Sequence, residues 1–244
     1  MKKLVALLLL APALALASSA GLKLDRAPVD LNLDNLPSLQ RGAQVFVNYC
    51  LNCHSAAYMR YNRLTDLGLS EQQIRDNLMF AADKVGETMN VAMRTKDAAQ
   101  WFGAPPPDLT VTARSRGADW LYSYLRSFYR DPARPTGWNN LVYPSVAMPH
   151  VLFQLQGVQV MRMEEGTDAH GHKTQTPRLA LDTPGRMTPL EYDRLAGDLT
   201  NYLVYMGEPV GNSRVQIGIV ALLLLGAFIV VSWLLKRAFW KDVH

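Results

Sequence analysis

Hydrophobic residues are concentrated towards the two ends of this chain of 244 residues. Near the N-terminus, an apolar run from Leu4 to Leu16 follows two lysines and is itself followed by small residues, the order typical of a secretory signal peptide. The run is too short to span a bilayer comfortably. We therefore predict that residues 1–20 form a signal peptide, cleaved after Ala17 or Ala20, and that the remaining chain is exported.

The second apolar run, from Val215 to Leu235, contains 21 residues and no charge. As an α-helix it would be about 31 Å long, which is the thickness of the hydrocarbon core of a bilayer. Three cations follow within six residues, and positively charged residues mark the cytoplasmic end of such helices. The pattern predicts a transmembrane helix at 215–235, a cytoplasmic tail at 236–244 and an exported domain at 21–214.

Two amphipathic helices are predicted near the start and the end of the exported domain. Gly42, Phe46 and Cys50 recur at intervals of four, which places them on one face of a helix through residues 39–49. The second helix begins at Thr188, where Thr-Pro-Leu-Glu supplies an N-cap, a first-turn proline and a capping-box acid. An apolar stripe follows this start: Leu195, Leu199, Tyr202, Leu203 and Met206.

Weaker sequence patterns predict two further helices and a strand in the middle of the chain. Ser70, with Gln73 three residues later, predicts the start of a helix that reaches Met79. Residues 119–129 are rich in aromatic side chains and predict a further helix, whereas residues 158–163 alternate as a strand does. The domain is therefore predicted to be mainly α, with long inserted loops and a small β-like segment.

Composition and charge exclude several classes of protein. The apolar fraction of 49% and the charged fraction of 19% are those of a folded chain rather than a disordered one. The net charge of +4 comes from the termini, because residues 21–213 hold 19 basic and 20 acidic residues. A nucleic-acid-binding protein would carry its positive surplus on the folded body, so we expect no nucleic-acid partner. Only two cysteines are present, which excludes a disulfide-stapled scaffold.

The strongest motif is Cys50-Leu51-Asn52-Cys53-His54, the C-x-x-C-H signature of covalent haem attachment. Two thiols three residues apart on one helical turn can reach the two vinyl groups of one porphyrin, and His54 then lies beneath the iron. A zinc site would need more ligands than these residues supply. A redox dithiol would be expected in a βαβ setting, which the surrounding pattern lacks. We predict one covalent haem c in a class I-like c-type cytochrome domain. Small c-type cytochromes cross their first and last helices at a glycine, and this resemblance implies that the two amphipathic helices cross with Gly42 allowing their close approach.

No comparable motif identifies the second axial ligand of the iron. Met148 is favoured because it lies in an irregular stretch about a hundred residues after the motif, and Pro149 stiffens that stretch and blocks a helix. Met89 and Met93 remain as alternatives. His150 is a rival, although we expect a polar surface or propionate-side histidine there.

The stretch 104–116 has features suited to the edge of a haem. Three consecutive prolines at 105–107 have fixed φ angles and no amide donors, so they can wall an apolar crevice without leaving a donor unsatisfied. Arg114 and Arg116 follow, and either guanidinium can neutralise a partly buried propionate. The aromatic helix at 119–129 is suited to packing on the porphyrin.

Taken in order, these features resemble the cytochrome c1 family, the c-type haem subunits of ubiquinol–cytochrome c reductase (bc1) complexes. The resemblance runs from about residue 39 to 240 and rests on C-x-x-C-H, A-P-P-P-D-L with its arginine pair, a short A-M-P segment and a final helix ending in Lys-Arg-x-x-Trp. It implies that Cys50 and Cys53 form the thioether bonds and that His54 and Met148 bind the iron. It also implies further haem contacts, with Arg116 at a propionate and Pro106, Trp120 and Tyr143 near the porphyrin. The chain departs from the family at Phe102, where an asparagine is common.

The resemblance also implies a function. A six-coordinate His/Met iron has no open position for a substrate, so the chain would pass single electrons without substrate-bond chemistry of its own. It would take them from the Rieske iron–sulfur protein and give them to a soluble or anchored cytochrome c. It would do so beside cytochrome b in a complex expected to be dimeric, with the haem domain on the periplasmic side of the bacterial inner membrane.

Two points stay open at this level. A membrane-anchored monohaem carrier outside a bc1 complex is the alternative, but such a shuttle would need a longer linker than the eight residues at 207–214. Glu164, Glu165 and Asp168 form an acidic cluster in the loop expected after residue 163, which is a candidate docking surface although a solvated loop is favoured. His170 and His172 lie nearby, and we expect no metal there.

Overall fold

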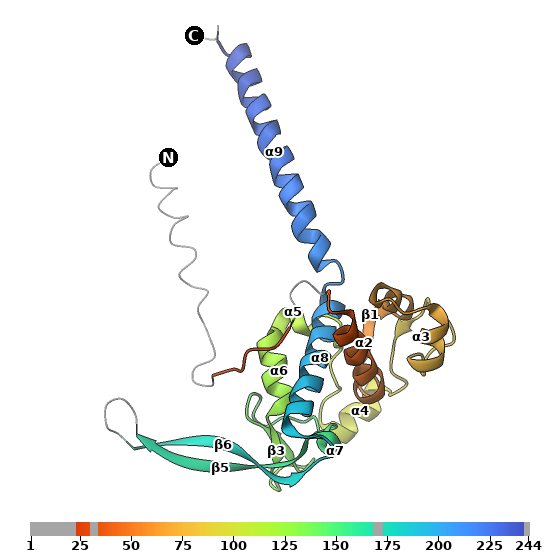
Figure 1. Ribbon diagram of the computed structural model, residues 1–244, viewed down its shortest axis with the longest axis vertical. Coiled ribbons are helices and arrows are strands. Elements are labelled where there is room, and N and C mark those ends of the chain that lie inside the picture. The colour runs from red at the N-terminus through yellow and green to blue at the C-terminus, as the bar shows by residue number, and fades with distance from the viewer. Residues whose placement is uncertain (1–22, 30–33, 168–172, 242–244) are drawn as a thin grey trace.

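The computed structural model describes residues 23–29, 34–167 and 173–241, so the predicted signal peptide lies outside the described residues. About half of the chain is helical, with three small two-stranded sheets, and one long C-terminal helix stands clear of the domain (Figure 1). The prediction of a mainly helical domain with a small β component and one C-terminal apolar helix is confirmed.

The first and last helices of the domain cross in close contact. Helix α2 (Leu36–Val45) packs against helix α8 (Pro189–Gly207), and Gly42 lies at the contact. A Cβ atom at Gly42 would lie 2.2 Å from the Asp198 carbonyl oxygen and 2.6 Å from Tyr202 Cβ. The ring of Phe46 lies beside that of Tyr202, with 5.5 Å between centroids. The predicted crossing and the role of Gly42 are confirmed.

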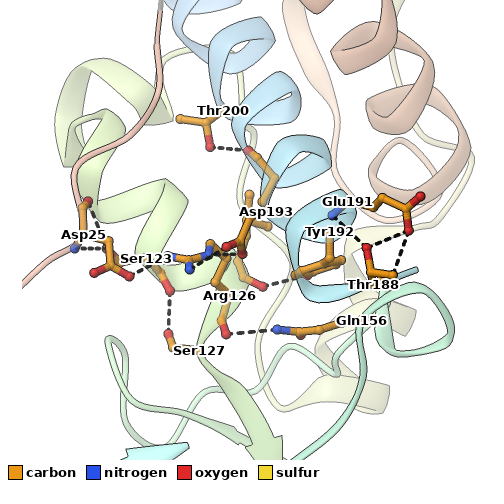
Figure 2. Close-up of polar contacts among 12 residues, drawn as sticks. Asp25, Ser123, Arg126, Ser127, Gln156, Thr188, Glu191, Tyr192, Asp193 and Thr200 are labelled. Atoms are coloured by element: carbon orange, nitrogen blue, oxygen red, sulfur yellow. Dashed lines mark hydrogen bonds and ion pairs between the residues drawn. The ribbon is translucent and has the colours of Figure 1, made fainter. Parts of the chain in front are cut away.

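Both predicted capping boxes form. Thr188 caps α8 by accepting from the backbone N–H of Glu191, whose side chain in turn accepts from the Thr188 backbone (Figure 2). Ser70 and Gln73 do the same at helix α3 (Glu71–Asn77). The prediction that Met79 is helical is wrong, because α3 ends at Asn77.

The other helices of the domain are short and lie between the haem motif and α8 in the chain. They are a 3₁₀ helix η3 (Tyr61–Leu67), α4 (Thr95–Phe102), α5 (Thr112–Arg116), α6 (Ala118–Arg126) and α7 (Phe153–Gln156). Helix α6 ends three residues earlier than predicted, at Arg126. The Ser127 hydroxyl donates to the Ser123 carbonyl, and the backbone then leaves the helical conformation.

Arg126, the last residue of α6, ties three parts of the domain together. Its Nε donates to Asp193 of α8 over 2.6 Å, and another guanidinium nitrogen pairs with Asp25 of the N-terminal segment (Figure 2). The Tyr192 hydroxyl donates to the Leu125 carbonyl over 2.8 Å. Helix α6 is therefore held between α8 and the N-terminal segment.

Each small sheet is an antiparallel pair. Strands β1 (Ala56–Arg60) and β2 (Thr88–Met89) pair beside the haem motif, and β3 (Phe128–Arg130) pairs with β4 (Trp138–Asn140). Strands β5 (Gly157–Thr167) and β6 (Lys173–Pro184) form a long hairpin that projects from the domain (Figure 1). The predicted strand at 158–163 is confirmed, and it continues to Thr167.

The prediction that the acidic cluster lies in a loop is wrong for two of its residues, because the hairpin is longer than expected. Glu164 and Glu165 lie within β5 rather than in a loop, because the strand continues past residue 163. Arg178 of β6 reaches across the hairpin to the Glu164 carboxylate at 3.1 Å. Asp168, His170 and His172 lie outside the described residues.

Helix α9 (Gly211–Phe239) contains the predicted membrane span. Only residues 208–210 separate it from α8, fewer than the sequence suggested. The Glu208 carboxylate binds Arg214 of α9 and lies 3.7 Å from Arg114 of α5. At the far end, the Lys236 and Arg237 side chains lie over tryptophan rings, as cations and aromatics do at a membrane surface.

Candidate haem site

The haem motif lies where α2 changes its hydrogen-bonding pattern. The helix continues as one turn of π-helix, η2 (Phe46–Cys50), a form that often marks functional sites. The carbonyl of Cys50 then accepts from the N–H groups of both Cys53 and His54, at 3.0 and 2.8 Å. This tight turn places the two cysteines and the histidine on one short segment.

Cys50 is buried and Cys53 is partly buried. Burial raises the pKa of the Cys50 thiol to about 12, and it also raises the pKa of Cys53. The pair lies at the C-terminal end of a helix, where the backbone dipole disfavours a thiolate. A dithiol oxidoreductase needs a lowered thiol pKa, so the environment argues against redox catalysis by these cysteines.

His54 is oriented by the proline segment, as an axial ligand requires. Its Nδ1 lies 2.7 Å from the carbonyl oxygen of Pro107, and because a carbonyl only accepts, Nδ1 carries the proton. Burial lowers the pKa of His54, which keeps the ring neutral. The neutral tautomer leaves Nε2 available to bind a metal.

The segment bearing Pro107 is tied back to the motif. The N–H of Leu109 donates to the Ser55 carbonyl over 2.9 Å, and the Asp108 carboxylate accepts from the N–H of Ala57 over 2.7 Å. Pro106 lies partly buried in this segment, beside the residue that orients His54. The expected rigid wall is therefore connected, through Asp108 and Leu109, to the residues that directly follow the C-x-x-C-H motif.

Met148 lies in a loop that is organised by two buried asparagines. The Asn140 Oδ1 accepts from the N–H groups of Val142 and Tyr143, and the Asn139 Oδ1 accepts from that of Ser145. Ser145 has a φ of +63°, which is uncommon for a residue other than glycine and is held by these bonds. The sequence analysis missed both asparagines, since no spacing or periodicity marks them.

The aromatic residues expected near the porphyrin do gather in one place. The Arg116 guanidinium lies 5.0 Å from the Trp120 ring and 5.9 Å from the Tyr143 ring. Trp120 in turn stacks on Tyr124, whose hydroxyl lies 3.3 Å from the Met148 sulfur. The structure thus brings Arg116, Trp120, Tyr143 and Met148 together, and it adds Tyr124, which the sequence analysis did not single out.

The two arginines of this region have different surroundings. Arg114 points to Glu208 at the start of the membrane linker, so its charge is already paired. Arg116 makes no ion pair with any residue that the structure describes. This difference favours Arg116 as the partner of a propionate.

Of the alternatives to Met148, Met93 is partly buried and stays open as a prediction, whereas Met89 and His150 are buried. The Met89 side chain is fully buried in the core, with its sulfur 3.8 Å from the Tyr202 hydroxyl. His150 is 3% exposed, so the expectation of a surface histidine is wrong. It stacks on Phe128 with 4.8 Å between centroids and meets the Trp138 ring edge-on, because the loop folds it under the β3–β4 sheet.

The residues fit a covalently attached haem. Two thiols stand three residues apart, and one neutral imidazole is oriented by a backbone carbonyl. A thioether lies in a constrained loop, in contact with an aromatic cluster over which the Arg116 guanidinium lies. Within the described residues, no three His, Cys, Asp or Glu side chains gather as a metal site would require. Fold and site together define a c-type cytochrome domain carried on one apolar C-terminal helix.

Comparison with known proteins identifies the family. Residues 32–176, more than half of the chain, match the model of the Cytochrome C1 family. The chain is 48% identical over 247 residues to cytochrome c1 of Allochromatium vinosum, covering all of both chains. It is 50% identical over 243 residues to a Nitrosomonas europaea protein named ammonia monooxygenase gamma subunit, covering 100% of this chain and 98% of that one. A third relative, cytochrome c1 of Rhodospirillum rubrum, is 31% identical over 85% of this chain and 82% of its own length.

The chain therefore belongs to the cytochrome c1 family. Its cofactor is covalent haem c, with Cys50 and Cys53 in the C-x-x-C-H positions. It is a haem-containing electron carrier and a membrane subunit of the bc1 complex.

Proposed function

We propose that this subunit accepts single electrons from the Rieske iron–sulfur protein and passes them to a soluble or anchored cytochrome c, beside cytochrome b in a dimeric complex. The observation that carries this proposal is the hydrogen bond of His54 to Pro107, which orients an imidazole for permanent axial ligation directly after two cysteines. Bound through Cys50 and Cys53, with His54 and Met148 as axial ligands, the haem would supply a one-electron couple.

The residues around the proposed ligands favour fast electron transfer because they hold those ligands in one geometry. Pro107 holds the His54 ring in one tautomer, and Asn139 and Asn140 hold the loop of Met148. Ligands held in the same geometry in both oxidation states leave little to reorganise when an electron moves. Arg116 would offset the charge of a propionate. Pro106, Trp120 and Tyr143 would cover the porphyrin and keep water from it.

The connection to the membrane helix supports a fixed position in a complex rather than a tethered shuttle. Only three residues join α8 to α9, and Glu208 among them binds both α9 and α5. Helix α5 also carries Arg116, so the site and the membrane helix share a rigid connection. In this proposal, residues 1–20 are removed on export, residues 21–214 face the periplasm, 215–235 span the inner membrane, and 236–244 lie in the cytoplasm.

Replacement of Met148 by leucine tests the ligand assignment. We expect membranes carrying the variant to retain c-type haem but to show a midpoint potential lower by more than about 100 mV, because the axial ligand is a main determinant of haem potential. Quinol-driven reduction of cytochrome c should fail with it. Met161→Leu is the matched control, since Met161 lies exposed on the hairpin. An unchanged potential in Met148→Leu would place the ligand elsewhere.

Purification separates the proposed complex from the anchored-carrier alternative. A subunit of a quinol–cytochrome c reductase should copurify in mild detergent with b-type haem and with the iron–sulfur signal of a Rieske protein. A carrier outside such a complex would elute alone and would still show its haem spectrum. Isolation of the chain with neither partner, from membranes that contain both, would refute the assignment of partners.

A further inference from the structure

Three segments lie together at the end of the haem domain from which the membrane helix leaves. A Cβ atom at Gly207, the last residue of α8, would lie 3.2 Å from Arg114 Cγ and 3.5 Å from the Thr110 carbonyl oxygen. The N–H of Tyr58 in β1 donates to the Thr110 hydroxyl oxygen over 3.4 Å. Figure 1 shows β1, α5 and the end of α8 near the base of α9, with the β5–β6 hairpin at the opposite end of the domain.

This end of the domain exposes apolar side chains. Tyr58 is 81% exposed, Val111 is 49% exposed, and Val210, in the connection to α9, is 57% exposed. Apolar residues that gather on an exposed surface mark a site of interaction with a protein or a membrane. Tyrosine is enriched at membrane–water interfaces, because its ring has an apolar body and a polar tip. We call Tyr58, Val111 and Val210 the seating surface.

The length of α9 places the seating surface at the level of the lipid headgroups. The helix has 29 residues and rises about 43 Å. A bilayer with both headgroup regions is about 40–45 Å thick. If the charge-free run from Val215 fills the hydrocarbon core, residues 211–214 rise about 6 Å above it, and one headgroup region is about as thick. Val210 therefore lies at the outer boundary of that region, and any tilt of the helix lowers it further.

The connection between the domain and α9 is too short and too well held to lift this surface away. Only residues 208–210 separate α8 from α9. The Glu208 carboxylate binds Arg214 of α9 and lies 3.7 Å from the Arg114 guanidinium of α5. Two guanidinium groups share this one carboxylate, so a positive charge remains at the level of the headgroups. That charge complements a lipid phosphate, a group that arginine is well suited to bind.

We propose that the seating surface lies in the lipid headgroup layer on the domain side of the membrane, with Arg114 and Arg214 at lipid phosphates. The proposal depends on α9 as the membrane span and not on the identity of the axial ligand. Because β1 and α5 contact the lipid at points beside the helix, they limit rocking of the domain about its short connection. The haem is then held at a fixed height and orientation relative to the membrane.

Photo-crosslinking of the wild-type chain tests the proposal without any substitution. The haem-loaded chain, in its complex, is placed in phosphatidylcholine nanodiscs that contain a phospholipid with a diazirine on its headgroup. Adducts are located by mass spectrometry after illumination, and we expect them on the peptides that contain Tyr58 and Val111. The peptide that contains Leu190 is the internal control, because Leu190 is 60% exposed at the far end of α8 and should carry no adduct.

Two results of this experiment would overturn the proposal. The first is a yield at Tyr58 and Val111 no higher than at Leu190, since the surface would then face water or protein. The second is adducts that form only when the chain is separated from the rest of its complex, since a partner subunit would then cover the surface. Neither result would alter the haem spectrum or the potential that test the proposed function.

Labelling of single-cysteine variants gives a second, quantitative measurement. Cys50 and Cys53 are bound to the haem, so the introduced cysteine of Val111→Cys or Leu190→Cys is the free thiol. In nanodiscs, a charged maleimide should label Val111→Cys about threefold to tenfold more slowly than Leu190→Cys, the factor expected from burying about half of a valine side chain. An unchanged haem spectrum shows that each variant is folded. Equal rates would overturn the proposal, and slow labelling without lipid adducts would assign the surface to a protein partner instead.

Discussion

Substitution of Gly42 by alanine tests how the helix crossing supports the haem motif. The added methyl group would lie 2.2 Å from the Asp198 carbonyl oxygen and 2.6 Å from Tyr202 Cβ. The first of these is a backbone atom of α8, so the clash cannot be relieved by a side-chain rotation. Helices α2 and α8 would have to separate by roughly 1 Å, about the shortfall from an ordinary contact. Overpacking of a core costs about 1–3 kcal/mol, and we expect the upper end of that range here.

The assay is thermal unfolding of the purified full chain with its haem, followed by circular dichroism at one scan rate. A loss of about 3 kcal/mol corresponds to a fall in Tm of roughly 6–12 °C for a domain of this size. Gly86→Ala is the matched control, because a Cβ atom there meets nothing within 4 Å. Haem content per chain should also fall in Gly42→Ala, since α2 leads directly into Cys50. A Tm within about 2 °C of the wild type would refute the argument that the crossing requires a glycine.

Three further predictions concern the contacts around α8 (Figure 2). Thr188→Ala removes the N-cap and should lower the free energy of unfolding by about 1 kcal/mol in denaturant titrations, whereas Thr188→Ser should restore it. The hydrogen bonds from the Thr188 backbone and hydroxyl lower the pKa of Glu191 below its ordinary value of 4.5, so their stabilisation is present above that value and is lost as the pH falls through the folded-state pKa. The stability difference between wild type and Glu191→Gln should therefore shrink on acidification, and a difference that grew would contradict this sign. Asp193→Ala should cost about 1 kcal/mol after allowance for solvent screening, since Arg126 keeps Asp25 as a partner, and an unchanged denaturation midpoint would show that the pair contributes nothing.

The elements that could be predicted from the sequence are those with local causes. The capping boxes at Ser70 and Thr188 form because the partners lie three residues apart. The apolar run before the final cations produced a helix whose bounds contain the predicted span. Helical spacing places Gly42 on the face of Phe46 and Cys50, and the resemblance to small c-type cytochromes marked it as the crossing point.

The errors came from contacts between distant residues. Helix α6 ends early because the residues after Ser127 pair with β4. The strand at 158–163 extends into a long hairpin since β6 offers a partner along its whole length. His150 is buried because Phe128 and Trp138, both remote in sequence, enclose it.

The sequence by itself determined the haem-attachment chemistry and the C-terminal membrane helix of this protein. The thiols, the imidazole and the apolar C-terminal run are encoded by residue type and short spacing, which need no tertiary contact to be read. The tertiary structure alone decided how the two proposed ligands, His54 and Met148, are held. The Pro107 carbonyl keeps the His54 proton on Nδ1. Tyr124 contacts the Met148 sulfur, and Asn140 bonds to the Tyr124 carbonyl. These contacts join segments that only the packed fold brings together.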